Sequence, residues 1–395
     1  MNSLKSLFLL DPEIIYLNHG SFGSCPRPVF EVYQDWQRRL EKQPVKFLGR
    51  LFNQLMEDSR SKLAEFLGVN PDELVYFSNP TTALNMVARN LASSRFGLKN
   101  GDEILTTDHE YGAMDRTWRY ICRQTGARYV QQPLPLPFTN PEDFVERFWE
   151  GVTPRTRAIF ISHITSPTAL IFPIREICSR ARQAGLLTIV DGAHAPGQIQ
   201  LDLPDVGADI YAGACHKWLC SPKGAAFLYA RKEIQSWLYP LVVSWGYESE
   251  QPGPSQFIDY HEWQGTRDIS AFLSVPAAID FQIQHDWDQV RSKAHTLAVQ
   301  TRQKINELTG LKPICPDSGA YVWFAQMFSA RLPQLDPELL KQWLYDDFQI
   351  EVPVIRWNDE IFLRISIQGY NDEQDAGALI AALSQLLLHL AVRTS

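Results

Sequence analysis

The sequence predicts an α/β protein built on a mainly parallel sheet flanked by helices. Short apolar runs such as 186–190 are too brief for helices and read as buried strands that end on polar turns. From residue 156 to residue 195 these runs alternate with a stretch of helical length, which is typical of right-handed βαβ units. With 395 residues, 45% of them hydrophobic, the chain can form one large and one smaller domain.

The first informative segment is YLNHGSFGSCPRP, residues 16–28, which predicts a loop. Its two glycines, Gly20 and Gly23, allow close approach of the backbone to a ligand, and two prolines follow. His19 in this loop is a candidate substrate contact, although a lone histidine is more often a structural hydrogen-bond partner. Residues 29–66 then show helical spacing, which predicts a docking or dimer surface.

The next segment, from Glu73, predicts a strand, a turn and a helix. Thr81 and Thr82 stand where the helix begins, so free N–H groups and hydroxyls gather at its positive end. A phosphate fits such a position, and so does a simple N-cap by either threonine. A second strand and turn, DEILTTDHEYGAM, ends in Tyr111, which by itself indicates packing at the rim of a site.

Further along, ARYVQQPLPLPF predicts an extended crossing because of its prolines, and FVERFWEGV predicts a helix. TRAIFISHITSPTALIFPI predicts another buried strand, which ends in a polar turn that contains Ser166. Ligands in open α/β sheets collect at such carboxyl ends of strands.

Asp191 and Lys217 carry the strongest chemical signal. Asp191 ends the apolar run at 186–190, and Lys217 follows the apolar patch DIYAGA, between His216 and Trp218. Pyridoxal phosphate (PLP) links an amine as an imine and draws electrons from its Cα into a protonated pyridine ring, so it requires a lysine and an acid. A buried aspartate stays ionised beside a positive partner, and the pyridinium would be that partner. A turn cap and a solvated lysine are the alternatives for each residue alone.

The C-terminal third predicts a smaller α+β region. It has a helix over 286–308, strands near Tyr321 and Ile350, and the segment IFLRISIQGYND, which contains Arg364. A guanidinium offers two parallel donors to a carboxylate, although an arginine on a strand is equally an edge residue. Before this region, Thr266 either caps a helix that begins near Ile269 or contacts a ligand.

Composition excludes several classes of function. The formal net charge of −8 gives no basic stripe for nucleic acid and no polybasic run for a membrane surface. SLFLL at the N-terminus is too short for a signal peptide, and AGALIAALSQLLLHLAV reads as an amphipathic helix, so we expect a soluble cytoplasmic protein. Six cysteines without a CxxC pair fit reduced thiols and offer no metal site.

Several of these segments resemble one known family. VDGAHAPGQ followed by ACHKW resembles the class V aminotransferase superfamily of PLP enzymes (fold type I), which includes cysteine desulfurases and isopenicillin N epimerase. LNHGSFG, HEYGA, HITSPTALIFP and CHKWL are most similar to the isopenicillin N epimerase-like branch. Similar segments run from Asn18 to Asn371, nearly the whole chain. The resemblance implies a seven-stranded, mainly parallel sheet, and we expect an N-terminal segment over the active site (1–28), a large PLP-binding domain (29–268) and a small C-terminal domain (269–395).

The resemblance also implies roles for the candidate residues. Lys217 would hold the cofactor and act as general base, Asp191 would face the pyridine nitrogen, and Arg364 would bind the substrate α-carboxylate. Ser166, a further expected cofactor contact, stands where desulfurases carry an asparagine that bonds the phenolic oxygen, so this contact is either altered here or carried by another group, for which His194 is the expected substitute. The remaining expected cofactor contacts are a stacking aromatic ring at Tyr111 and, around the phosphate, Thr81, Thr82, His216 and Thr266, the last from the neighbouring subunit of a homodimer. Ala214 replaces the usual serine, so one phosphate hydroxyl is missing.

The reaction stays open at this level. The loop VPVIRWNDEIF contains no cysteine, which argues against a persulfide-forming desulfurase. The branch implies epimerisation at Cα of an amino acid or an amino-acid-containing peptide, with a β-lyase for C–S bonds or an aminotransferase as alternatives. A non-catalytic scaffold or sensor with the PLP fold is the alternative of another class. Tyr111 and His19 are candidates for the second acid that an epimerase needs.

Overall fold

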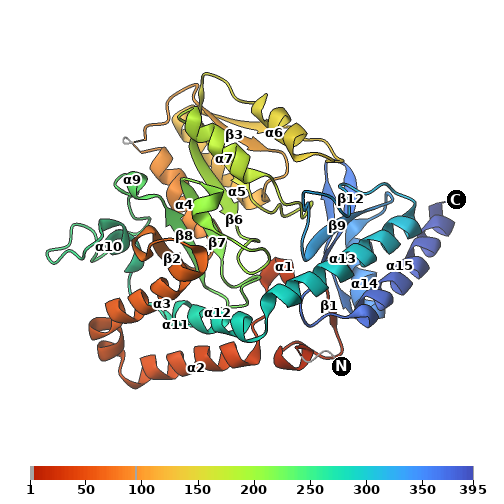
Figure 1. Ribbon diagram of the computed structural model, residues 1–395, viewed down its shortest axis with the longest axis horizontal. Coiled ribbons are helices and arrows are strands. Elements are labelled where there is room, and N and C mark those ends of the chain that lie inside the picture. The colour runs from red at the N-terminus through yellow and green to blue at the C-terminus, as the bar shows by residue number, and fades with distance from the viewer. Residues whose placement is uncertain (1–3, 94–95, 395) are drawn as a thin grey trace.

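The computed structural model describes residues 4–93 and 96–394, and its centre is a seven-stranded sheet (Figure 1). The strand order is β2-β8-β7-β6-β5-β3-β4, and only β8 runs against the others. The predicted α/β class with a mainly parallel seven-stranded sheet is therefore confirmed. The strands are β2 Leu74–Phe77, β3 Glu103–Thr107, β4 Arg128–Gln132, β5 Thr156–Ser162, β6 Leu187–Gly192, β7 Ile210–Ala214 and β8 Ala226–Ala230.

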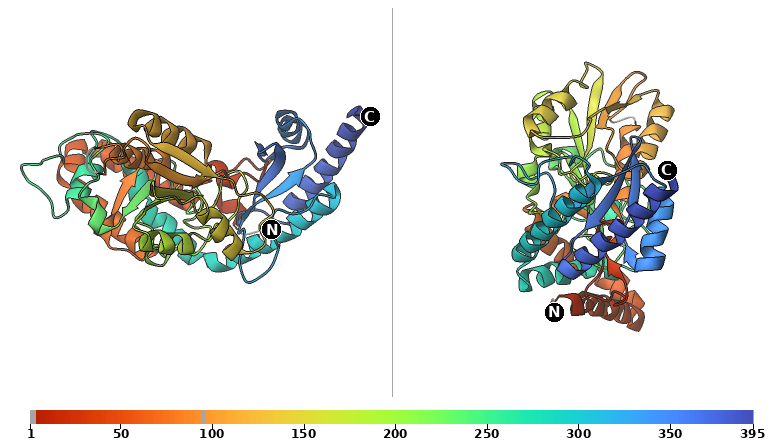
Figure 2. Two further views of the ribbon diagram at one scale, coloured as in Figure 1. Left: turned by 90° about the horizontal axis from the view of Figure 1, so that it is seen from above. Right: turned by 90° about the vertical axis from the view of Figure 1, so that its right-hand side faces the viewer.

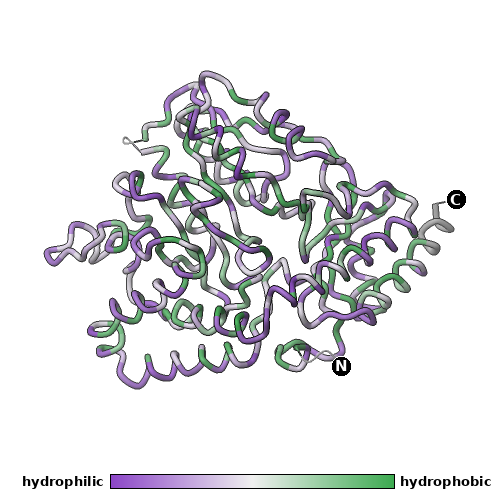
Figure 3. The backbone as a smooth tube through the Cα atoms, viewed as in Figure 1, coloured by the Kyte–Doolittle hydropathy of each residue, from purple (hydrophilic) through white to green (hydrophobic). Residues whose placement is uncertain are grey.

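Helices cover both faces of this sheet. Successive side chains of a strand point to opposite faces, and here the side chains on both faces are apolar and have to be buried. Val190 and Tyr211 belong to one apolar cluster with α3, α6, α7 and α12, whereas Ile189 and Ile210 belong to a second cluster with α4, α5 and α10. The strands are thus apolar on both faces. By contrast, α2, which lies at the periphery, is largely hydrophilic (Figure 3). The helices of this region are α2 Arg27–Lys42, α3 Phe52–Leu67, α4 Pro80–Leu91, α5 Gly112–Thr125, α6 Pro141–Trp149, α7 Ile174–Gln183, α8 Leu203–Val206, α9 Lys232–Gln235, α10 Gln256–Glu262, α11 Ser270–Leu273 and α12 Val275–Gln284, with short turns of 3-10 or π helix at Lys5–Leu7, Lys46–Arg50 and Pro71–Glu73.

A second, antiparallel sheet of order β11-β12-β9 lies to one side of the large sheet (Figures 1 and 2). Its strands are β9 Met327–Leu332, β11 Val354–Trp357 and β12 Glu360–Ser366. The helices of this part are α13 Trp287–Thr309, α14 Pro337–Phe348 and α15 Glu373–Thr394. The prediction of a strand near Tyr321 is wrong, because β9 begins only at Met327, after a Gly- and Ser-containing stretch.

The N-terminal segment joins the two sheets. β1 (Ile15–Tyr16) pairs in parallel with β10 (Ile350–Glu351), and the Ser366 N–H donates to the Leu17 carbonyl. The predicted loop that follows contains a four-residue helix, α1 (His19–Phe22), which lies between the two sheets (Figure 1). The N-terminal segment therefore meets the C-terminal strands and the large sheet at once.

The proposed boundary at residues 268 and 269 stays a prediction; α11 and α12, just beyond it, contact α2 and α3. Within residues 4–93 and 96–394, none of the helices combines the length and apolar character that crossing a bilayer requires.

Candidate active site

The carboxyl ends of β3, β5, β6 and β7 meet at one edge of the large sheet, opposite β12. Asp191 lies near the end of β6, and Lys217 follows the end of β7 by three residues. Ser166 follows β5, and its backbone and side chain contact Arg364 of β12. The structure thus brings together the predicted lysine, aspartate, serine and arginine at the edge where ligands collect in such sheets.

Lys217 is partly buried, and its Nζ lies 3.3 Å from Nε2 of His194. Burial lowers the pKa of the Lys217 ammonium to about 8; Arg364 lowers it further, and Asp191 partly offsets the effect. An amine with this pKa is about one-tenth neutral at pH 7, a far larger share than in an ordinary lysine, so more of it has a lone pair for bonding to a carbonyl carbon or for taking a proton.

Asp191 is buried, and the N–H of Ala193 donates to its Oδ1 at 3.0 Å. Burial raises the pKa of this carboxyl above its ordinary value, whereas the Ala193 N–H and the Lys217 charge lower it. The aspartate therefore sits where a cationic ring nitrogen would stabilise its charged form. A buried carboxylate in this position fits the protonated pyridine nitrogen of PLP.

Arg364 is buried at the end of β12 and is held in place by two serines. Nη1 donates to the Ser166 carbonyl at 2.8 Å and to its Oγ at 3.1 Å, and Nη2 donates to Ser21 Oγ at 2.9 Å. Its buried Nε has no hydrogen-bond partner among the described residues. Burial lowers the pKa of the guanidinium to about 10, and Tyr111 raises it slightly. A buried donor without a partner is energetically costly. An anionic ligand that accepted a hydrogen bond from this Nε would relieve that cost.

Tyr111 and His216 lie at the same edge. Tyr111 precedes α5, is 47% exposed, and is close enough to Arg364 to affect its pKa. His216 is partly buried, and its Nδ1 donates to the Ala225 carbonyl at 2.8 Å, which leaves Nε2 for another group.

The positive end of α4 is capped by Asn79, a residue that the capping hypothesis for Thr81 and Thr82 did not name. Asn79 Oδ1 accepts the Thr82 backbone N–H at 2.8 Å and the Thr82 hydroxyl at 3.0 Å. Both threonines are partly buried and lie in the first turn. Because Asn79 performs the capping, the Thr81 side chain is not required for it, which suits an anion contact.

Thr266 lies apart from these residues, exposed in the loop between α10 and α11. The expectation that it serves a neighbouring subunit requires this kind of exposure, since a buried side chain could not reach another chain.

His19 supports the lysine loop, and the structure gives no opening for its expected contact with a substrate. It is fully buried, its Nδ1 lies 3.0 Å from the Tyr370 hydroxyl, and its Nε2 lies 3.1 Å from the Lys217 carbonyl. Burial lowers the pKa of its ring to about 3, so it stays neutral. With both ring nitrogens bonded to protein, His19 is a structural residue here.

Sequence reasoning missed Glu110, a buried carboxyl behind Asp191. Thr107 Oγ1 donates to its Oε1 at 2.7 Å, and Ser162 Oγ donates to its Oε2 at 2.5 Å. Burial raises the pKa of Glu110 to about 8, and nearby Asp191 also raises it. Its position directly before Tyr111 in the HEYGA motif was the available signal.

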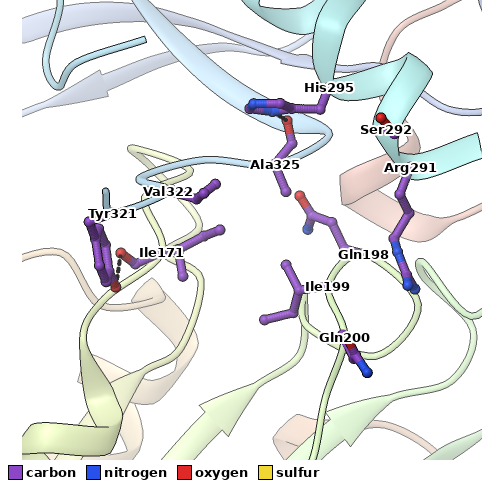
Figure 4. A pocket seen from close by; sticks show the side chains of 10 residues that line it. All are labelled: Ile171, Gln198, Ile199, Gln200, Arg291, Ser292, His295, Tyr321, Val322 and Ala325. Carbon is purple, nitrogen blue, oxygen red and sulfur yellow. Dashed lines mark hydrogen bonds between the residues drawn. The ribbon is translucent and has the colours of Figure 1, made fainter. Parts of the chain in front are cut away.

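A separate pocket of about 420 Å³ lies between the turn after β6 and α13, and contains none of the predicted site residues (Figure 4). Gln198 lines it from the end of the Asp191 turn. Its Nε2 donates to the His194 carbonyl at 2.8 Å, and its Oε1 accepts the Met327 N–H at 3.0 Å. Gln198 thereby fixes the backbone that carries His194.

Comparisons with known proteins show the family of the chain and its fold. The family model for Aminotransferase class-V matches residues 15–379. An isopenicillin N epimerase from Amycolatopsis lactamdurans is 38% identical over 95% of this chain and 96% of its own length. A probable chloroplastic L-cysteine desulfhydrase from Arabidopsis thaliana is 29% identical over 95% of this chain and 84% of its own. The apo structure of a cysteine desulfurase from Thermococcus onnurineus NA1 has the same fold, with a TM-score of 0.80 at 20% identity over 97% of both chains.

Proposed function

Because the chain belongs to the aminotransferase class-V family, we propose that it is a PLP-dependent enzyme that acts at the Cα of an amino acid or an amino-acid-containing peptide. The favoured reaction is epimerisation, since the relative at 38% identity is an isopenicillin N epimerase. The observation that carries the proposal is the meeting of Lys217, Asp191 and Arg364 at one edge of the sheet.

The residues present fit the cofactor. PLP, when bound, supplies an electron sink that acidifies the Cα–H of an attached amino acid. Lys217 would hold its aldehyde carbon and Asp191 its ring nitrogen, and His194 would contact its phenolic oxygen together with Ser166 or in its place. The other proposed contacts are the ring of Tyr111 and, around the phosphate, Thr81, Thr82, His216 and the Thr266 of a second subunit.

Arg364 is proposed to orient the substrate. Its unsatisfied Nε and the adjacent Nη2 form one edge of the guanidinium, and a carboxylate can accept from both. Nη2 donates to Ser21 Oγ in this structure. A substrate carboxylate would replace this neutral acceptor with a charged one, or share Nη2 with it. Fixing the carboxylate fixes which Cα bond faces Lys217.

Proton transfer at Cα is proposed to begin with Lys217, because its lowered pKa leaves a larger neutral fraction of the amine near neutral pH than an ordinary lysine has. An epimerase must also return a proton from the opposite side. Of the two candidates, His19 is committed to Tyr370 and the Lys217 carbonyl, whereas Tyr111 has an exposed side chain beside Arg364. Tyr111 is therefore the better candidate for the second acid.

A β-lyase for C–S bonds is the second candidate, favoured by the likeness to an L-cysteine desulfhydrase. A persulfide-forming desulfurase fits less well: all six cysteines are buried, and none follows Cys315. An aminotransferase and a non-catalytic PLP-fold scaffold stay alternatives. A homodimer with shared sites and a cytoplasmic location complete the proposal; the first rests on the exposed Thr266 loop and the second on the free thiols.

The first test is the visible absorption of the purified protein with PLP, beside Lys217→Ala and Lys217→Arg. We expect a cofactor band in the wild type that is lost or altered in both variants. We also expect the band to change on addition of particular L- and D-amino acids. Loss of the α-proton signal by NMR in D2O from both enantiomers would support epimerisation, and release of sulfide from cysteine would support the lyase. A wild type without any band would contradict the proposal.

A further inference from the structure

Trp218, next to Lys217 in the chain, constrains the protonation of His194. Trp218 is fully buried, and its Nε1 lies 3.4 Å from Nδ1 of His194. An indole N–H only donates hydrogen bonds, so Nδ1 must present a lone pair. Burial lowers the pKa of His194 well below its ordinary value, and Lys217 and Arg364 lower it further. The ring is therefore neutral, and its single proton resides on Nε2.

The proton on Nε2 in turn affects the protonation state of Lys217. Nε2 lies 3.3 Å from Nζ of Lys217, close enough for a weak hydrogen bond. Since Nε2 carries hydrogen, it donates, and Nζ must accept through a lone pair. A protonated lysine has no lone pair, so only the neutral amine completes the chain from Trp218 through His194 to Lys217.

We propose that Trp218 is a positioning residue: its indole N–H holds His194 in the tautomer that donates from Nε2, and this tautomer favours the neutral form of the Lys217 amine over the ammonium. The catalytic meaning of this inference rests on the proposed function. The tautomer and the state of the amine do not, because both belong to the protein without cofactor.

The competing arrangement shows what Trp218 prevents. If Lys217 were an ammonium bonded to Nε2, the His194 proton would move to Nδ1, where it would face the Trp218 N–H. Two donors would then oppose each other in a buried site. The other charged or titratable groups that face Lys217 are Arg364, which favours the neutral amine, and Asp191, which favours the ammonium; the pKa of His216 is lowered in part by Lys217.

The chain contains a matched control in Trp118. Trp118 is also fully buried, and its Nε1 has no hydrogen-bond partner among the described residues. It lies on α5, where its ring packs against Phe160. Trp118→Phe therefore removes the same atoms as Trp218→Phe without removing a hydrogen bond.

The test uses the full-length protein without cofactor. Competitive labelling with acetic anhydride across pH, read by mass spectrometry at Lys217, gives the pKa of its amine. We expect a value near 8 in the wild type and in Trp118→Phe. In Trp218→Phe, His194 is free to accept from an ammonium, so we expect a pKa higher by about one unit.

The second readout is ¹⁵N NMR of histidine-labelled protein, with the His194 signals identified by their loss in His194→Gln. At about pH 9, above the Lys217 pKa, we expect the proton on Nε2 in the wild type and in Trp118→Phe, and a shift toward Nδ1 in Trp218→Phe. A wild-type ring protonated on Nδ1 would overturn the inference even if Trp218→Phe failed to fold. So would an unchanged Lys217 pKa in a folded Trp218→Phe. If the tautomer is as expected but PLP gives no band, the proposed function fails and the hydrogen-bond chain stands.

Discussion

Glu110, a buried carboxyl near Asp191, affects the electrostatics of the site. Glu110 is fully enclosed, accepts hydrogen bonds from Thr107 and Ser162, and has a pKa of about 8 because burial disfavours its charge. At neutral pH it is mostly an uncharged acid. Because the protonated Glu110 is uncharged, it does not repel the Asp191 carboxylate. Asp191 can therefore stay ionised beside a cationic ring nitrogen.

This pKa predicts a pH effect on folding. Between about pH 4.5 and pH 8 the folded protein keeps a Glu110 proton that the unfolded chain releases, so the free energy of unfolding falls as pH rises, by up to about 1.4 kcal/mol per pH unit. Glu110→Gln removes this contribution. Urea unfolding at pH 5 and pH 8 should show that the variant gains stability relative to wild type at the higher pH.

Glu103, at the start of β3, is the control. Burial raises the pKa of its carboxyl, but a hydrogen bond from Thr153, a hydrogen bond and the charge of Arg155, and the charge of Arg128 outweigh burial and lower it. Glu103→Gln should therefore cost stability about equally at pH 5 and pH 8. If Glu110→Gln behaved in the same way, the buried acid would be ionised and the account above would be wrong.

At this scale, the sequence could predict residues whose chemistry follows from position on a strand. Asp191 and Lys217 stand at strand ends beside small and polar neighbours, so the folded sheet brings them together. Ser21 was not predicted, because its contact with Arg364 spans 343 positions in the chain. His19 could not be assigned either, since only the packed structure shows that both of its ring nitrogens are taken.

Among the elements, the segment around α1 packs closely against the loop that carries Lys217. Gly23 has a φ of +70°, and a Cβ there would lie 2.1 Å from the His216 carbonyl oxygen. Lys223 Nζ also donates to the Gly23 carbonyl at 2.9 Å. The glycine is required both by its conformation and by the space that it leaves.

Gly23→Ala should therefore be more destabilising than backbone strain alone explains. Gly310 has a similar φ of +66°, and a Cβ added there would have nothing within 4 Å, so Gly310→Ala measures the strain without the overlap. We expect Gly23→Ala to lower the free energy of unfolding by about 1–3 kcal/mol more than Gly310→Ala. Thermal unfolding of the two variants measures the difference; equal losses would mean that the loop moves away without cost.

Elements with strong apolar patterns were predictable, and those defined by weak patterns were not. The run at 186–190 matches β6, and the helical spacing of 29–66 matches α2 and α3. The extended crossing at 127–138 includes an edge strand, β4, because its prolines begin only after Gln132. The strand expected near Tyr321 failed because aromatic residues there pack in an irregular segment, as Tyr321 does against Trp323.

For the whole molecule, the exposed position of Thr266 makes assembly testable. If the threonine serves the site of a second subunit, a dimer of Lys217→Ala and Thr266→Val subunits contains one native site, with the lysine of one chain and the threonine of the other. The two homodimers contain none. We expect the mixed dimer to bind one PLP with wild-type affinity and the Thr266→Val homodimer to bind about tenfold more weakly.

The mixed dimer can be isolated with two different affinity tags, and its PLP affinity can be measured by titration of absorbance. A mixed dimer whose affinity equals that of the Thr266→Val homodimer would place Thr266 outside the partner's site. A monomer at all working concentrations would contradict the shared site altogether. Assembly of this kind was predictable only from the family resemblance, because an exposed threonine has no pattern of its own.

Contacts between the N-terminal segment and the C-terminal part affect when the lysine site can form during biosynthesis. His19 bonds to Tyr370 across 351 positions, and β1 has no partner strand until β10 exists. At the usual 5–20 residues per second, a ribosome takes roughly 20 to 70 seconds to make the chain between them. During that interval the nascent chain can build the large sheet while the loop that carries Lys217 lacks its N-terminal support. The lysine site is therefore among the last parts of the protein to mature.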